Sequence, residues 1–267
     1  MMSPSVWPFQ SPSAHESVSG IIRRRSTNST DVRLAAIGDL DLASARKVLD
    51  LGCGFGFMAE ALGDCIAPDA EIVGIDLWPT NEAPFLAKVS ATGRRGRFFC
   101  AEVGSTFPCP DGTYDLVVSS YSLYFFVGAL PEVARILAPE GLFLAITHSE
   151  RSFIGLLRAA GLHPDKSPLL SLGHRFSAEN GREQLGEWFG EVNRVDYQNS
   201  LHFDAEHADE LLAYLRFKLP LMVAGVSPGD DLPKEIETAA RGALSRFGAV
   251  VVEKDDAIFR CRRPVCR

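Results

Sequence analysis

The chain has 267 residues, of which 46% are hydrophobic and 23% are charged, so disorder over most of its length is excluded. Its formal net charge of −7 and isoelectric point of about 5.4 argue against a protein that binds nucleic acid through the phosphate backbone. The apolar run over residues 219–226 is too short to cross a bilayer and contains Pro220, so no membrane partner is expected.

The N-terminal residues divide into two segments by composition. Residues 1–20 hold six serines and three prolines without apolar periodicity, which predicts a disordered tail. Residues 21–45 are predicted to form a helical segment that opens with three arginines, Arg23–Arg25. These arginines fit either a solvated helix face or a contact for an anion or the substrate. The main domain is expected over residues 46–267.

From residue 46 onward, short β-branched runs alternate with stretches of helical periodicity. This alternation is typical of right-handed crossovers between parallel strands, with the helices lying on the faces of one sheet. The predicted strands are 47–51, 71–76, 97–101, 114–119 and 142–147, and the predicted helices between them include 57–62 and 128–137.

The C-terminal part predicts a different organisation, with a helical insertion over residues 204–247 before the last strand. This insertion either covers a ligand site at the edge of the sheet or merely packs on the sheet. The strand before it is expected to lie parallel to the others, and the strand after it is expected to return antiparallel. The predicted elements are a helix from 177, a strand over 191–203, a helix from 204 stopped by Pro220, a helix from 233 ended by Gly248, and a closing strand or hairpin over 249–261.

A glycine-rich turn follows the first predicted strand, where residues 48–56 read VLDLGCGFG. Glycines at this place let the backbone turn sharply and approach a ligand, and the next helix begins with free N–H groups. A nicotinamide-binding turn requires the pattern G-x-G-x-x-G, but Phe57 stands at the third glycine position. Asp50 at the strand tip would suit a cationic ligand and repel a pyrophosphate.

This turn resembles the first motif of the class I S-adenosylmethionine-dependent methyltransferases, in the group called the type 11 methyltransferase domain. The resemblance spans residues 46–149 and continues in order with VGID at 73–76, FPCPDGTYDLV at 107–117 and LAPEG at 137–141, where Glu140 replaces a family glycine. It implies an α/β, Rossmann-like fold with a mostly parallel seven-stranded sheet, helices on both faces and a C-terminal helical insertion.

The same resemblance implies S-adenosylmethionine as the cofactor, bound by the cofactor half of the domain over residues 46–149. The glycine turn would face the methionine moiety, Asp50 its ammonium, and Asp76 both ribose hydroxyls. Leu77 would lie beside the adenine, and Glu102 would meet the adenine amino group. The implied cofactor-binding residues are Asp50, Gly52, Cys53, Gly54, Gly56, Asp76, Leu77, Glu102, Val103, Ser119 and Ser120.

The acceptor side is expected beyond the carboxyl ends of the strands, where ligands bind in open parallel sheets. Tyr121 and Tyr124 follow the fourth predicted strand and either line the acceptor site or pack in the core. His148 follows the fifth strand and has the pKa range of a general base. The alternative is a histidine that is only hydrogen-bonded at a strand end.

The six cysteines form no C-x-x-C pair and no metal-ligand spacing with histidine, so no metal site is predicted. Their pattern predicts reduced thiols in a cytoplasmic protein.

The expected function is methyl transfer from S-adenosylmethionine to an oxygen, nitrogen or carbon atom of a small molecule. An RNA or protein methyltransferase and a non-catalytic, cofactor-binding regulatory protein are the alternatives. No nucleic-acid partner is expected, and the oligomeric state, including a homodimer, is left open. The fourth strand ends in SSYS at 119–122, without the Asn/Asp-Pro-Pro-aromatic segment of amino-adenine methyltransferases.

Overall fold

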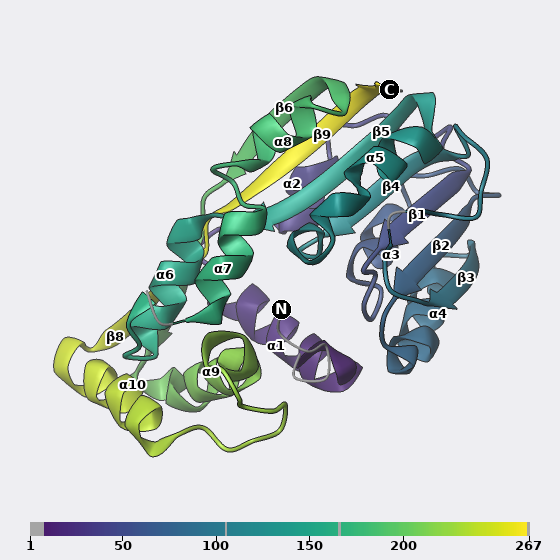
Figure 1. Cartoon of the computed structure of the whole chain (residues 1–267). Helices are drawn as coiled ribbons and strands as arrows, with labels where there is room; N and C mark the ends of the chain where they lie inside the picture. The colour runs from purple at the N-terminus through teal and green to yellow at the C-terminus, as the bar shows by residue number, and fades with distance from the viewer. Residues whose placement is uncertain (1–7, 105, 165–166, 266–267) are drawn as a thin grey trace. The chain divides into compact units, whose positions relative to one another are not determined.

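The computed structural model describes residues 8–104, 106–164 and 167–265 (Figure 1). The chain divides into two compact units built from segments that are far apart in the sequence. The sheet unit comprises residues 30–147, 175–197 and 257–267, and the helical unit comprises residues 1–29, 148–174 and 198–256. The helical unit is therefore larger than the predicted 204–247 insertion.

The sheet unit contains a seven-stranded sheet with the order β3-β2-β1-β4-β5-β9-β6. The pairs β1–β2, β1–β4, β2–β3 and β4–β5 are parallel, as the alternation of strands and helices predicts. Its strands are β1 (Lys47–Leu51), β2 (Glu71–Asp76), β3 (Arg95–Cys100), β4 (Tyr114–Ser120), β5 (Leu137–His148), β6 (Phe189–Tyr197) and β9 (Asp256–Pro264).

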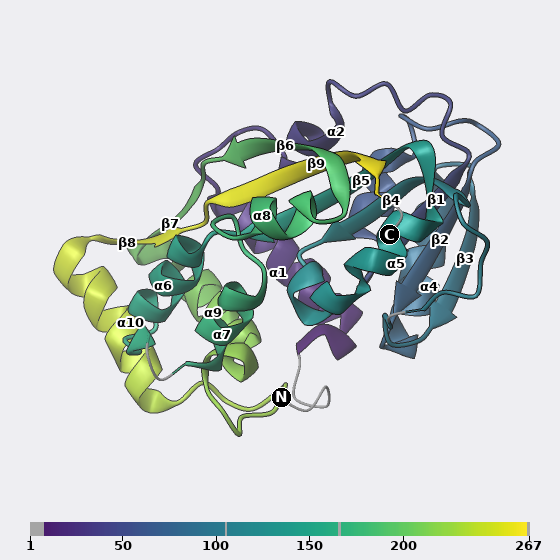
Figure 2. The same cartoon turned by 45° about the horizontal axis from the view of Figure 1, so that its top comes forward.

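The last strand, β9, runs antiparallel to β5, its neighbour in the sheet (Figure 2). Asp256 at the start of β9 contacts His148 at the end of β5, with Oδ1 and Nδ1 2.6 Å apart. Near the other end, the guanidinium of Arg262 donates to the carbonyl of Glu140 at 3.1 Å. The sheet is thus mostly parallel, which confirms the predicted fold class.

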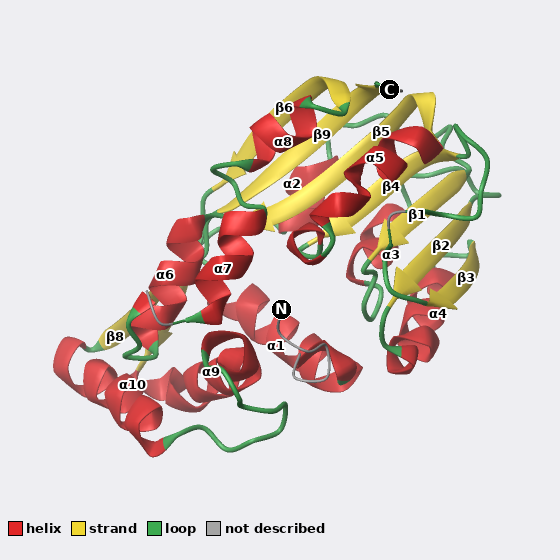
Figure 3. Cartoon of the chain, in the orientation of Figure 1, coloured by secondary structure: helices red, strands yellow, loops and turns green. Residues whose placement is uncertain are grey.

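Helices cover both faces of this sheet, as Figure 3 shows with α5 and α8 on one face and α2 and α3 on the other. The second face is a continuous apolar core in which Ile37, Met58 and Phe85 pack with strand residues such as Val118. The helices of the sheet unit are α2 (Val32–Ile37), α3 (Phe57–Leu62), η3 (Pro79–Asn81), α4 (Glu82–Ala91), η4 (Leu123–Phe125), η5 (Val127–Ala129), α5 (Leu130–Ile136) and α8 (Gly181–Gly186).

The helical unit contains a two-stranded antiparallel sheet, β7–β8, in which Leu201 pairs with Val252. Glu210 accepts ion pairs from Arg24 and Arg25 at 2.7 and 2.9 Å, which gives two residues of the basic patch a structural role. Its elements are η2 (Pro8–Gln10), α1 (Pro12–Arg25), α6 (Glu150–Ala159), α7 (Pro168–Arg175), β7 (Ser200–Asp204), η7 (Ala205–His207), α9 (Ala208–Met222), α10 (Lys234–Phe247) and β8 (Ala249–Glu253). None of the helices described is long and apolar enough to cross a membrane.

The predicted disordered tail is wrong for the part of it that the structure describes. Residues 1–7 lie outside the described residues, but η2 begins at Pro8 and α1 extends from Pro12 to Arg25. The hydroxyl of Ser11 accepts from the N–H of Ala14 at 3.4 Å, and a proline follows the cap as the first helical residue. Val18 and Ile21 are buried, so tertiary packing orders a segment whose composition indicates a tail.

The single strand predicted over 191–203 is also wrong, because the chain breaks at 198–199 into β6 and β7. β6 belongs to the main sheet, whereas β7 pairs only with β8, so neither β7 nor β8 lies in the main sheet as expected. The helix expected to stop at Pro220 continues to Met222. Leu221 and Met222 are buried, so their packing offsets the backbone hydrogen bond that Pro220 lacks. The helix predicted from Pro233 to Gly248 is confirmed as α10.

Candidate functional site

The glycine turn after β1 has a backbone conformation that other residues rarely adopt. Gly52, Gly54 and Gly56 have φ angles of 68°, 51° and 88°, in the left-handed region that favours glycine. The N–H groups of Gly52 and Cys53 both donate to the carbonyl of Ile75, at 2.8 and 3.1 Å. The turn is therefore held against the end of β2, and its glycines present backbone without side chains.

Asp76, the last residue of β2, is bound into this turn by its carboxylate. Oδ2 accepts from the N–H of Gly54 at 2.9 Å, and Oδ1 accepts from the N–H of Trp78 and the side-chain amide of Asn81, each at 2.9 Å. Asp76 is 8% exposed, and Asn81 is fully buried. The sequence predicts Asp76 but not Asn81. The only feature that could indicate Asn81 is its position, five residues after the carboxylate at the end of the strand.

Asp50 in β1 is a buried carboxylate, 2% exposed, directly before the glycine turn. Among the described residues, no group donates a hydrogen bond to it. Burial, together with the negative charge of Asp76, raises the pKa of Asp50 to about 7. A buried carboxylate without a partner is costly, so this site fits a ligand that brings a positive charge.

The three serines after the centre of β4 have different surroundings. The hydroxyls of Ser119 and Ser122 lie 2.7 Å apart, and Ser122 donates to the carbonyl of Leu51 at 2.7 Å, which ties β4 to β1. A Cβ on Gly52 would lie 2.6 Å from the Cβ of Ser122, so only glycine fits beside this serine. The buried hydroxyl of Ser120 has no hydrogen-bond partner within the described part of the chain. The sequence does not predict this role of Ser122.

The remaining predicted cofactor residues lie at the same carboxyl edge of the sheet. Cys53 is buried, and burial, followed by the charge of Asp50, raises the pKa of its thiol, so it is an unreactive packing residue. Leu77 is half-buried after β2. Glu102 is exposed and Val103 is buried in the loop after β3. Contacts of these four side chains with a cofactor remain predictions.

The two predicted acceptor residues follow β4 in a sharp turn. Tyr121 has a φ of 55°, unusual for a residue with a side chain, and its N–H donates to the carbonyl of Ile146 at 2.8 Å. Its ring is partly buried against the apolar core. Tyr124 is buried and its ring lies 4.7 Å from that of Phe125. Both rings contribute to packing, and contact with an acceptor remains a prediction.

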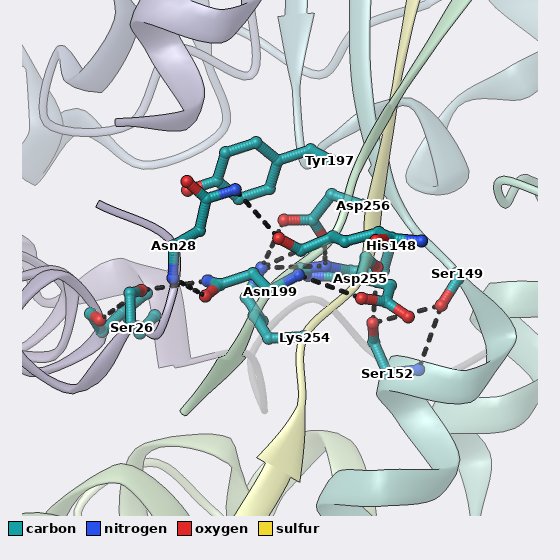
Figure 4. Close-up of polar contacts among 12 residues, drawn as sticks. Ser26, Asn28, His148, Ser149, Ser152, Tyr197, Asn199, Lys254, Asp255 and Asp256 are labelled. Carbon is teal, nitrogen blue, oxygen red and sulfur yellow. Dashed lines mark hydrogen bonds and ion pairs between the residues drawn. The ribbon is translucent and has the colours of Figure 1, made fainter. Parts of the chain in front are cut away.

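His148 ends β5 and takes part in a buried polar cluster of the helical unit (Figure 4). Its Nδ1 lies 2.6 Å from Oδ1 of Asp256, whose Oδ2 accepts from the ammonium of Lys254 at 2.8 Å. Burial, followed by the charge of Lys254, lowers the pKa of His148 to about 4. Burial would raise the pKa of Asp256, but the charges of Lys254 and His148 bring it below its ordinary value. Near neutral pH the cluster thus holds a neutral histidine and an ionised Asp256.

Backbone and side-chain hydrogen bonds hold this cluster in place. The N–H of Lys254 donates to the carbonyl of Asn199, whose own N–H donates to the carboxylate of Asp255, both at 3.0 Å (Figure 4). The carbonyl of Asp255 accepts from the N–H of Ser149 at 3.0 Å and from the hydroxyl of Ser152 at 2.5 Å. Asn199, which lies between β6 and β7, therefore holds the segment that carries Lys254.

The sequence does not predict Lys254 and Asp256 as site residues. Their signal was a charged run between two apolar stretches, which is typical of an exposed turn, whereas both side chains are buried. Among the residues that the structure describes, no group of three or more His, Cys, Asp or Glu side chains is arranged to hold a metal ion.

Comparisons with known proteins find a methyltransferase domain over the part of the chain that contains the glycine turn. A family described as a methyltransferase domain matches residues 48–141. The demethylmenaquinone methyltransferase of Thermus thermophilus is 38% identical over 107 residues, which are 39% of this chain and 48% of that protein. A ubiquinone/menaquinone biosynthesis C-methyltransferase of Syntrophotalea carbinolica is 27% identical over 184 residues, or 64% of this chain and 77% of that protein. The chain thus spans about half the length of the first relative.

Solved structures share the fold at low sequence identity. The YcgJ protein of Bacillus subtilis is 18% identical with a TM-score of 0.52, covering 93% of this chain and 99% of that one. The [4+2]-cyclase SpnF is 16% identical with a TM-score of 0.54, covering 98% and 99%. These likenesses concern the fold alone. Through residues 48–141, the chain is similar to methyltransferase domains, which agrees with its resemblance to the class I S-adenosylmethionine-dependent methyltransferases.

Proposed function

We propose that the chain binds S-adenosylmethionine and transfers its methyl group to an oxygen, nitrogen or carbon atom of a small molecule. The observation that carries this proposal is the pair of buried carboxylates, Asp50 and Asp76, on the two sides of a glycine turn. A pyrophosphate would be repelled there, whereas a ligand with an ammonium and a sulfonium would be attracted.

The residues of the sheet unit would bind the cofactor as follows. Asp50, which lacks a hydrogen-bond donor among the described residues, accepts from the ammonium. Asp76 accepts from the ribose hydroxyls while its bonds to the turn keep the carboxylate oriented. The unpartnered hydroxyl of Ser120 offers one more polar contact. When bound, S-adenosylmethionine supplies an electrophilic methyl group, so the protein must orient it and handle one proton.

His148 is our candidate for the group that takes the proton from the acceptor. With Asp256 ionised and 2.6 Å away, Nδ1 carries the hydrogen and donates it, which leaves the lone pair on Nε2. A proton accepted at Nε2 would create an imidazolium that the Asp256 carboxylate stabilises. Lys254 keeps Asp256 ionised in this buried setting.

The acceptor is proposed to be a small molecule. Two relatives are named for demethylmenaquinone and for ubiquinone/menaquinone biosynthesis, which supports a small organic acceptor. The acidic composition disfavours RNA, the main alternative among enzymes. We further propose that the insertion over 204–247, which contains α9 and α10, helps to bind the acceptor.

Cofactor binding and turnover test this function separately. In calorimetric titrations, S-adenosylmethionine should bind and NAD should not; tighter binding of NAD would contradict the proposal. With a panel of small phenols, amines and carbon acids, release of S-adenosylhomocysteine should follow. Binding without any release would favour the regulatory alternative, and turnover only with RNA or protein would favour the macromolecular one.

A variant separates the base from the binding residues. His148→Gln should lower kcat by about a hundredfold or more while the Kd for S-adenosylmethionine stays unchanged. His202→Gln, which alters an exposed histidine on β7, is the matched control and should leave both quantities unchanged. An unchanged kcat in His148→Gln would assign this histidine a purely structural hydrogen bond.

A further inference from the structure

The helix that follows the glycine turn, α3, has little within itself to fix its first residues. It contains six residues, and Gly56, its N-cap, is in the left-handed conformation and has no side chain with which to cap it. A helix of this length is marginal by itself, and the groups at its start need partners from outside the helix. The conformation of the turn therefore depends on the side chains that contact the start of α3.

Arg33 in α2 contacts this start at a backbone, a ring and a carboxylate. Its Nη1 donates to the carbonyl of Phe57 at 3.2 Å and to the carboxylate of Glu60 at 2.8 Å. Its guanidinium carbon lies 4.7 Å from the ring centre of Phe57, within the range of a cation–π contact. Phe57 stands where a nicotinamide-binding turn requires glycine, so the departure from that pattern supplies the ring that Arg33 contacts.

The guanidinium of Arg33 is itself held by the residue that begins α2. Nε and Nη2 donate to the two carboxylate oxygens of Asp31, at 3.0 and 2.7 Å. Asp31 also caps α2, because its Oδ1 accepts from the N–H of Arg33 at 2.9 Å. A bidentate pair of this kind orients the planar guanidinium, and only 14% of the Arg33 side chain is exposed. The orientation of Nη1 toward α3 is therefore fixed within α2.

Lys88 in α4 supplies a second cation to the same place. Its Nζ lies 3.6 Å from the carboxylate of Glu60 and 5.5 Å from the ring centre of Phe55. The rings of Phe55 and Phe57 lie 6.3 Å apart, edge to face. A Cβ on Gly56 would come within 3.3 Å of the Lys88 side chain. The end of the turn is therefore enclosed by side chains of α2 and α4, both in the sheet unit.

We propose that Arg33 is a positioning residue for the cofactor turn, which it keeps in the binding conformation through Phe57 and Glu60. This inference rests on the proposed function, because it concerns the turn to which that function assigns S-adenosylmethionine. When the turn has its hydrogen bonds formed for only a fraction of the time, the apparent Kd rises by the inverse of that fraction. Arg33 thus acts on cofactor affinity through the turn.

The test is Arg33→Met, which removes the guanidinium and keeps an unbranched side chain. In calorimetric titrations of the full chain, the Kd for S-adenosylmethionine should rise by about threefold to tenfold, because the turn is formed for a smaller fraction of the time. In the free variant, the amides of residues 52–56 should exchange hydrogen nearly as fast as those of an unstructured peptide. Saturation with S-adenosylmethionine should restore their protection.

Arg260→Met is the matched control, because Arg260 in β9 holds the other end of α2. Its guanidinium donates to the carbonyls of Ala35 and Ala36, at 2.9 and 3.1 Å, and lies 2.6 Å from the carboxylate of Asp39. Its side chain is 12% exposed, and none of its hydrogen bonds or ion pairs within the described part of the chain reaches residues 52–60. The control should lose stability as Arg33→Met does, with Kd and exchange over 52–56 unchanged.

Equal rises in Kd in the two variants, at matched fractions folded, would show that α2 only supports the fold and would overturn the inference. An unchanged Kd, or unchanged exchange over residues 52–56, in Arg33→Met would overturn it as well. If Arg33→Met does not fold, Arg33→Lys decides, because lysine keeps the charge but cannot form the bidentate pair with Asp31. Its Kd should rise by a smaller factor, and a wild-type Kd would overturn the inference.

The wild type separates this inference from the proposed function. If the wild type does not bind S-adenosylmethionine, the proposed function fails and this inference fails with it. If the wild type binds the cofactor and Arg33→Met binds it equally well, only this inference fails.

Discussion

At the scale of single residues, the two carboxylates beside the glycine turn have opposite environments. Asp76 accepts three hydrogen bonds from the turn and the segment after β2, whereas Asp50 accepts none from the described residues. Asp76 therefore both organises the turn and is proposed to bind the cofactor. The unpartnered, buried carboxylate of Asp50 destabilises the free protein, and a cationic ligand would remove this penalty.

Replacing Asp76 should weaken cofactor binding more than a comparable structural change does. Asp76→Asn is expected to lower affinity for S-adenosylmethionine by about tenfold to a hundredfold, because charged hydrogen bonds to the ribose are lost. Asp115→Asn is the control, since its carboxylate accepts from the N–H groups of Arg46 and Lys47 at 2.8 and 2.9 Å, where β1 begins. Calorimetry after matching the fraction folded decides; equal affinity losses would mean that Asp76 only shapes the turn.

Asp50 should make the stability of the free protein depend on pH. Its pKa is about 7 in the folded chain and near 3.8 when unfolded, so folding takes up a proton between these values. The stability associated with this group is present in full below pH 4 and is lost as pH rises through 7. Asp50→Asn should therefore gain stability over the wild type as pH rises from 4 to 8, by a few kcal/mol, in urea melts.

Cofactor binding should favour the wild type over Asp50→Asn, because the substitution removes the proposed partner of the cofactor's ammonium group. Wild-type affinity for S-adenosylmethionine should rise as pH increases through about 7, and the variant should lack this rise. A stability difference that does not change with pH would show that Asp50 is ionised throughout.

At the scale of elements, the ends of α10 show how one backbone angle decides a helix boundary. Gly248 closes the helix with a φ of 77°, and its N–H donates to the carbonyl of Leu244 at 2.9 Å. A Cβ at Gly248 or at Gly242 would meet no atom within 4 Å, so space is equally free at both glycines.

Alanine at these two glycines should therefore have opposite effects. Gly248→Ala should cost about 1 kcal/mol, because the left-handed conformation is strained with a side chain. Gly242→Ala, inside the same helix, should stabilise by about 0.5–1 kcal/mol through helix propensity. Chemical denaturation of both variants checks this; destabilisation by Gly242→Ala would contradict the expectation that helix propensity decides the effect at this open position.

At the scale of the whole molecule, each unit has one proposed ligand, so ligands should protect different segments from hydrogen exchange. S-adenosylmethionine should slow exchange over residues 50–56 and 76–81, where the turn and Asp76 lie. A small molecule that the enzyme methylates should slow exchange over 208–222, the span of α9. Mass spectrometry of exchanged peptides measures both; no change in α9 with a turned-over acceptor would contradict an acceptor role for the insertion.

The sequence by itself determined the parallel core of the fold and the cofactor turn, because these depend on neighbours in the chain. Alternating strands and helices predict β1 to β5, and glycines with left-handed φ angles occupy the predicted turn. Asp50 and Asp76 are found by their position at strand tips, since strand register places both at one edge of the sheet.

Only the tertiary structure decided the rest, because it depends on residues far apart in the chain. A serine- and proline-rich segment becomes α1 when Val18 and Ile21 are buried, and one apparent strand breaks into β6 and β7, which join different sheets. The charged run at Lys254 and Asp256 is typical of an exposed turn, yet it is buried against His148, more than a hundred residues earlier. Local patterns carry propensity and spacing, whereas burial and charge pairing arise only once distant segments meet.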